Sequence, residues 1–140
     1  MQGYLLLIVY CSLLEDMEKT YIKLEDLRAY TIASDLCDYV WDIVIQWDWF
    51  AKQTIGSQFV RAIDSNASNI AEGFGRHFKK EKIQFFRYSR GSVYESSHWC
   101  KKADKRKLIT EEQYNHIINE LRKLPKEINI LIKNTNNLKE

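Results

Sequence analysis

Apolar side chains recur every three or four residues along most of this chain, and very little interrupts them. The 140 residues include only one proline and five glycines, so few positions favour a turn. A three-and-four spacing places apolar groups on one face of a helix, and sparse punctuation favours long helices over many short strands. The sequence therefore predicts an all-α fold, and a chain of this length suits a single domain.

Four helices are expected, over about residues 25–45, 54–74, 79–106 and from Thr110 onward. Thr110 and Gln113 have the spacing of a capping box, which marks the start of the last helix. Pro125 should kink or briefly break that helix, and the polar tail after Lys133 should fray. The connection over residues 46–52 is rich in aromatics, and the first helix carries more apolar surface than one core face needs. Both features favour contact with another subunit.

Small polar residues crowd the second helix between its apolar positions, at Ser65, Asn66, Ser68 and Asn69. Small residues inside a helix usually indicate close helix contact or hydrogen bonds across a seam. The same region contains the run NIAEGFGR at 69–76, followed by FFRYSRGS at 85–92 and by Glu95. These runs resemble the four-helix-bundle family first noticed in intervening sequences of bacterial large-subunit ribosomal RNA genes. The accessory proteins of diversity-generating retroelements are similar in fold.

The resemblance covers roughly residues 22–135. It implies a short, antiparallel up-down four-helix bundle that assembles as a ring-shaped homopentamer. It also implies a bacterial protein with no established enzymatic activity and with a role involving nucleic acid. The recurring family positions fall on Asn69, Glu72, Gly73, Gly75, Gly91, Ser92 and Glu95. For Glu72 and Arg76, which could pair at i and i+4, a structural role at the helix end or a subunit seam is favoured.

The small net charge of +2 conceals an uneven distribution of charge along the chain. Residues 1–75 hold 5 basic and 11 acidic side chains, whereas residues 76–107 hold 11 basic and 3 acidic ones. The basic segment could be an ordinary solvated surface facing acidic helices, or a patch for an anionic polymer; charge alone does not decide.

The third helix is expected to have an apolar side and a cationic side. Its spacing gathers apolar and small residues on one side and cations on the other, with Ile83 falling on the basic side and Lys82 near the apolar one. Gly91, costly inside a helix, is expected to allow a neighbouring helix to approach closely. Rows of cations suit phosphates, and an aromatic ring can stack on a base. The predicted nucleic-acid-binding residues are Arg76, Lys79, Lys80, Arg87, Arg90, Tyr94, Lys101, Lys102, Lys105 and Arg106.

Two readings of function remain open at this point. The first is a non-enzymatic homo-oligomer that binds RNA or DNA through the third helix. The second is a structural adaptor whose basic face docks an acidic protein, such as a nucleic-acid-processing enzyme. An enzyme is disfavoured, since no catalytic triad or phosphate-cradling loop is apparent. Glu95 and His98 form a single Glu-x-x-His, and a di-iron bundle needs two, so neither a metal nor a cofactor is expected.

The three cysteines, Cys11, Cys37 and Cys100, form no metal-binding pair and are expected to be reduced thiols of a cytosolic protein. Residues 1–16 stand apart from the bundle domain, predicted over 17–140. Their apolar run is too short to span a bilayer and lacks the basic start of a secretory signal, so no membrane partner is expected. Because Met17 follows directly, the segment is either a mis-assigned start or a piece packed on the assembly.

Overall fold

A computed structural model describes residues 3–9 and 21–139 of the chain, and every described element is helical. Residues 3–9 form a short helix. The remaining elements are the 3-10 turn η1 (Leu24–Asp26), the helices α2 (Arg28–Val44) and α3 (Trp49–Ala51), the π-helical turn η2 (Lys52–Gly56), and the helices α4 (Ser57–Gly75), α5 (Lys79–Lys105) and α6 (Glu111–Asn136). No strand occurs among these residues. The all-α prediction is confirmed.

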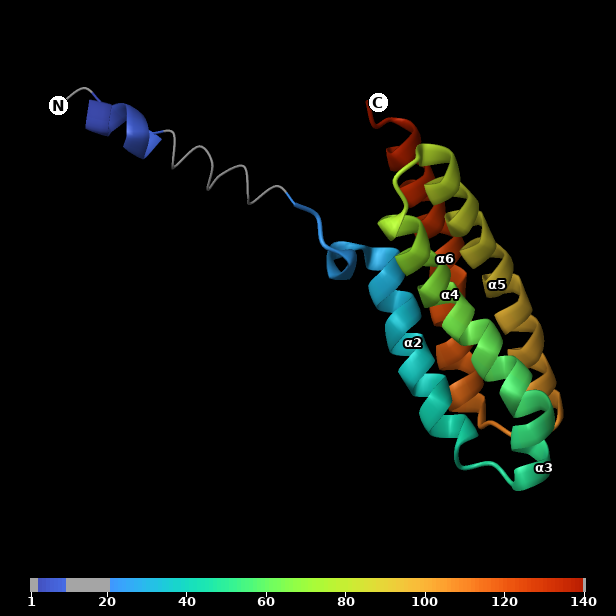
Figure 1. Cartoon of the computed structure of the whole chain (residues 1–140). Coiled ribbons are helices and arrows are strands. Elements are labelled where there is room, and N and C mark those ends of the chain that lie inside the picture. The colour runs from blue at the N-terminus through green and yellow to red at the C-terminus, as the bar shows by residue number, and fades with distance from the viewer. Residues whose placement is uncertain (1–2, 10–20, 140) are drawn as a thin grey trace.

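The long helices α2, α4, α5 and α6 lie side by side and run alternately up and down (Figure 1). Each packs on its neighbour in the chain, and α2 also packs on α6, which closes the arrangement. Their facing sides form one apolar core, whose largest fully buried side chains include Phe59, Leu36, Ile63, Ile70, Ile117, Leu121, Leu124 and Ile128. Numbered from α2 to α6, the structure has five helices rather than four, because the three-residue α3 precedes α4.

The second helical region begins earlier than predicted. The expected loop over residues 46–52 and the expected start at 54 are wrong, since helical structure begins at Trp49. The reason is local: the Asp48 carboxylate accepts a hydrogen bond from the N–H of Ala51 at 3.0 Å and caps the first turn. The π turn then brings Gly56 against α2, where an added Cβ would lie 2.9 Å from Val44.

The capping box predicted at the start of α6 is confirmed. The N–H of Gln113 donates to Thr110 Oγ1 at 3.1 Å, and the N–H of Thr110 donates to Gln113 Oε1 at 2.9 Å. A break at Pro125 does not occur, since α6 runs without interruption from Glu111 to Asn136. Leu124 and Ile128 are fully buried around the proline, so packing holds the helix together. The expected fraying after Lys133 is also too early, because Thr135 is still buried.

Polar side chains join α4 to α5 in the middle of the core, as their small-residue content predicts. Asn66 Nδ2 donates to Ser96 Oγ at 2.9 Å, and Ser89 Oγ donates to the backbone oxygen of Asn66 at 2.7 Å. The prediction for Gly91 is wrong: it is exposed, and nothing lies within 4 Å of where its Cβ would be. It falls between the core positions Ser89 and Val93 and therefore points away from α4.

Candidate nucleic-acid interface

The cations of α5 are arranged by the register of its buried positions. Core contact alternates at three and four residues, over Phe86, Ser89, Val93, Ser96, Cys100 and Ala103. Residues seven apart lie nearly above one another on a helix, about 10 Å apart along its axis. The residues that directly follow Phe86, Val93 and Cys100 therefore form one line along α5. That line holds Lys80, Arg87, Tyr94 and Lys101, all of which are exposed. Tyr94 is 70% exposed, so its ring is available for stacking.

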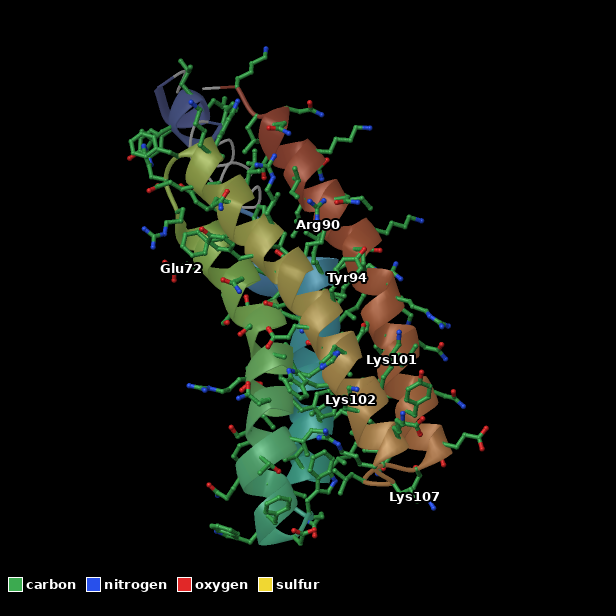
Figure 2. All side chains as sticks on the ribbon, turned by 90° about the vertical axis from the view of Figure 1, so that its right-hand side faces the viewer. Glu72, Arg90, Tyr94, Lys101, Lys102 and Lys107 are labelled. Atoms are coloured by element: carbon green, nitrogen blue, oxygen red, sulfur yellow. The ribbon has the colours of Figure 1, made fainter. Side chains whose placement is uncertain are left out.

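Arg90 shows which neighbour this line faces. Its Nη1 donates to Asn129 Oδ1 on α6 at 2.9 Å, so this side of α5 borders α6. Figure 2 shows Arg90, Tyr94 and Lys101 following one another along α5 on the side toward α6. Residues three, four and seven apart share one face of a helix, which places further exposed cations of α6 beside Asn129, namely Arg122, Lys126 and Lys133.

The surface that these side chains form on α5 and α6 is called the basic flank. It consists of Lys80, Arg87, Arg90, Tyr94 and Lys101 of α5 and of Arg122, Lys126 and Lys133 of α6. Sequence reasoning missed the three α6 residues. Their common spacing was visible in the sequence, but the contact that sets α6 beside this side of α5 was not.

Two of the other predicted binding residues, Arg76 and Arg106, lie on another side of the bundle. Arg76 forms the expected ion pair with Glu72 and lies over the Phe85 ring, 4.8 Å from its centroid. Phe85 therefore marks the side of α5 toward α4. Arg106, three seven-residue steps beyond Phe85, shares that side and lines a cavity with Asp48 and Phe50.

Burial separates the remaining three cations of the predicted set. Lys79 and Lys102 are half-buried. Lys105 is exposed and lies four residues after Lys101, so it shares the side of α5 that carries the basic flank. The ten residues predicted from sequence thus do not form one continuous surface.

Carboxylates of the described residues form no ion pair with the basic flank. Among residues 21–139 the ion pairs are Arg28–Glu127, Arg76–Glu72 and Lys123–Glu120, and none of them includes a residue of the flank. Glu127 pairs with the first residue of α2, which places its carboxylate toward α2. The cations of the flank are therefore not ion-paired with any carboxylate of residues 21–139.

Two residues that did not fit the predicted pattern have structural roles. Ile83, expected on the basic side, is buried. Lys82 Nζ donates to the backbone oxygen of Phe74 at 2.7 Å and, less closely, to that of Gly73 at 3.4 Å, both at the end of α4. It thereby satisfies carbonyls that the helix leaves without partners, and its burial lowers the pKa of the ammonium group.

The family-signature positions lie in local contacts or on open surface. Gly73 allows a close approach, because an added Cβ would lie 2.8 Å from the Phe86 ring, whereas Gly75 and Gly91 have open space. Asn69 Nδ2 donates to the backbone oxygen of Ser65, and Glu95 accepts from Trp99 Nε1. Ser92 Oγ donates to a carbonyl one turn earlier in its own helix. Their contacts within the chain are therefore structural.

The thiols and the ionisable groups offer little chemistry. Burial raises the pKa of both Cys37 and Cys100 to about 12, so both are protonated and unreactive near neutral pH. Cys11 lies outside the described residues. Within residues 3–9 and 21–139, no group of three or more histidine, cysteine or acidic side chains is placed to hold a metal ion.

Comparison with known proteins identifies the family. The family model described as 23S rRNA-intervening sequence protein matches residues 25–130, most of the helical bundle. The chain belongs to this family. A crystal structure of a protein of unknown function from the S23 ribosomal protein family of Bacteroides thetaiotaomicron has a similar fold, with a TM-score of 0.66 at 18% identity. The alignment covers 75% of this chain and 98% of that protein. No curated protein matches the chain.

In the described part of the chain, no helix is both long enough and apolar enough to cross a bilayer.

Proposed function

We propose that this protein binds the phosphate backbone of nucleic acid through the basic flank of α5 and α6, without catalysing a reaction. The observation that carries this proposal is a row of cations from two helices that no carboxylate of residues 21–139 pairs with. The family description refers to a ribosomal RNA intervening sequence, which is consistent with an RNA ligand.

The spacing of the flank suits a backbone rather than a base sequence. Steps of about 10 Å along α5 place charges at intervals that a flexible phosphate chain can follow. The exposed ring of Tyr94 lies between Arg87 and Lys101, where it can stack on any unpaired base. Binding should therefore depend weakly on sequence and fall steeply as salt increases, because each phosphate contact releases counterions.

The test is a salt titration of binding to single-stranded RNA and to duplex DNA. The double variant Arg87→Glu/Lys101→Glu should weaken binding and lower the slope of log affinity against log salt by about 2. Its control is Lys23→Glu/Arg61→Glu, which makes the same change in net charge at two exposed residues outside the flank. The control should keep the unmodified slope.

Two results would contradict the proposal. One is the absence of binding to RNA and DNA at low salt, and the other is an equal loss in the control. If nuclease-treated extracts instead yield an acidic protein that binds the wild type but not the flank variant, the flank is a protein-docking face and the protein is an adaptor.

We also propose that the protein works as a cytoplasmic homo-oligomer. In the single chain Trp41, Trp49 and Phe50 are 55%, 73% and 69% exposed, and aromatic surface of this extent favours an interface. The resemblance suggests a pentamer, and repeating the flank around a ring would add avidity to weak contacts. Light scattering measures the mass directly; a monomer at micromolar concentration would refute this part.

A further inference from the structure

At one end, the bundle consists of only three helices, α4, α5 and α6. The ion pair between Arg28 Nε and Glu127 Oε1, at 3.4 Å, marks where α2 begins beside α6. Beyond Glu127, α6 continues for nine residues to Asn136, or about 13 Å. The ends of α4 and α5 extend past α2 in the same direction (Figure 1). The corner that α2 would fill is therefore open.

This open corner is lined by apolar side chains from all three remaining helices. A cavity of about 190 Å³ lies between Phe74 of α4, Phe86 of α5 and Leu131 of α6. Ile22 and Leu138 form part of its rim and are 65% and 55% exposed. Since a cavity of about 150 Å³ with such a lining can hold a benzene ring, this one can accept one or two aliphatic side chains.

The chain also contains an apolar helix whose described side chains are all exposed. Residues 4–9 read YLLLIV, and each of these side chains is between 52% and 80% exposed. The helix over residues 3–9 has no polar face, and a helix of this length is not stable alone in water. Its length, about 10 Å, is close to the length by which α2 falls short of α6 at this end.

We propose that the helix over residues 3–9 docks into the open corner of its own chain and completes the bundle at that end. Ile22, which lines the cavity, is only thirteen residues from Val9 in sequence. An extended chain of that length reaches roughly 45 Å, so the tether permits docking without strain. It also keeps the helix at a high effective concentration near the corner.

Disulfide trapping tests this docking in the full chain. With Cys11→Ser to remove one native thiol, Leu138→Cys is combined with Leu5→Cys, Leu6→Cys, Leu7→Cys or Ile8→Cys, one pair at a time. Cys37 and Cys100 can remain, because burial raises the pKa of each to about 12. The control pairs the same helix cysteines with Trp49→Cys, an exposed residue next to the opposite end of α2.

Under mild oxidation, at least one pair with position 138 should close within one chain, at least about tenfold faster than its control, because a disulfide needs Cα atoms within about 7 Å. Equal rates in the test and control pairs would overturn the proposal. A disulfide between two chains would overturn it as well, since a second copy would then receive the helix.

Hydrogen exchange of the chain without added cysteines provides a second measurement. Amides of residues 3–9 should exchange at least about tenfold more slowly than in a free peptide. Ile22→Lys/Leu138→Lys should abolish this protection, and both substituted side chains are exposed, so the core should remain folded. Ile45→Lys/Tyr88→Lys replaces two exposed residues that do not line the corner and leaves Trp41, Trp49 and Phe50 in place, so it is the matched control and should leave the protection unchanged. Unprotected amides, protection that survives the rim substitutions, or protection that requires lipid vesicles would each overturn the proposal.

Discussion

Two helical glycines of the family signature should respond in opposite directions to the same substitution. Gly91 lies in the middle of α5 with open space around it, whereas Gly73 lies near the end of α4 against the buried Phe86. A helix-interior glycine costs about 1 kcal/mol relative to alanine. Gly91→Ala should therefore raise the free energy of unfolding by about 0.5–1 kcal/mol.

At Gly73 the same propensity gain is outweighed by a clash. The added methyl would lie 2.8 Å from Phe86 Cε1 and 3.0 Å from the backbone oxygen of Lys82. The ring is only 3% exposed, so it has little room to move, and overpacking costs about 1–3 kcal/mol. We expect Gly73→Ala to lower the free energy of unfolding by about 1–2 kcal/mol after the propensity gain is subtracted.

Urea denaturation of the two variants and the wild type measures both effects, provided the slopes against urea agree. A thermal scan should give the same signs, with shifts of about 3 °C per kcal/mol. If Gly91→Ala destabilised the protein, the reasoning from open space would be refuted, because a neighbouring subunit would then cover that face of α5. A neutral Gly73→Ala would refute the close approach of α4 to Phe86.

Three further predictions follow from the ends of the helices. Thr110→Ala removes the capping box of α6 and should lower the free energy of unfolding by about 1 kcal/mol in urea, whereas an unchanged midpoint would show that the cap contributes nothing. Lys107 has φ 57° after α5, a backbone region where glycine is unstrained, so Lys107→Gly should raise the melting temperature by relieving about 0.5–1 kcal/mol; its control, Lys105→Gly, should lower it. Burial lowers the pKa of Lys82 below the ordinary value of 10.5, so the unfolded chain holds this proton to higher pH than the folded one. Stability relative to Lys82→Met should therefore increase as the pH rises toward 10.5, and a decrease measured by urea denaturation on that approach would contradict the burial of the ammonium group.

Much of the fold could be predicted because it depends on local pattern. The three-and-four spacing of apolar residues identified α2, α5 and α6 with few errors at their ends, and Thr110 with Gln113 fixed the start of α6. The start at Trp49 was missed because aromatic residues were taken as loop content, although Asp48 is a good N-cap. Gly91 was misassigned because its small size was taken as a sign of close helix packing, although its spacing of two residues from the core positions Ser89 and Val93 places it on the opposite side of α5.

The candidate site was only partly predictable for a related reason. The sequence identified Arg87, Tyr94 and Lys101 as one line, since a seven-residue repeat within one helix needs no knowledge of neighbours. It could not identify Arg122, Lys126 and Lys133 as part of the same surface, because that depends on which side of α5 borders α6. It also could not show that Arg76 lies outside this surface, with its guanidinium over Phe85 and beside Glu72.

The sequence by itself determined that this protein is helical, that α5 has an apolar side and a cationic side, and that the chain carries the NIAEGFGR signature. Each of these depends on spacing within one helix, where 3.6 residues per turn fix the side on which a residue lies. The tertiary structure alone decided that α6 borders the cations of α5, that Lys82 caps α4, and that one corner of the bundle is open. These depend on contacts between segments far apart in sequence, which helical periodicity does not specify.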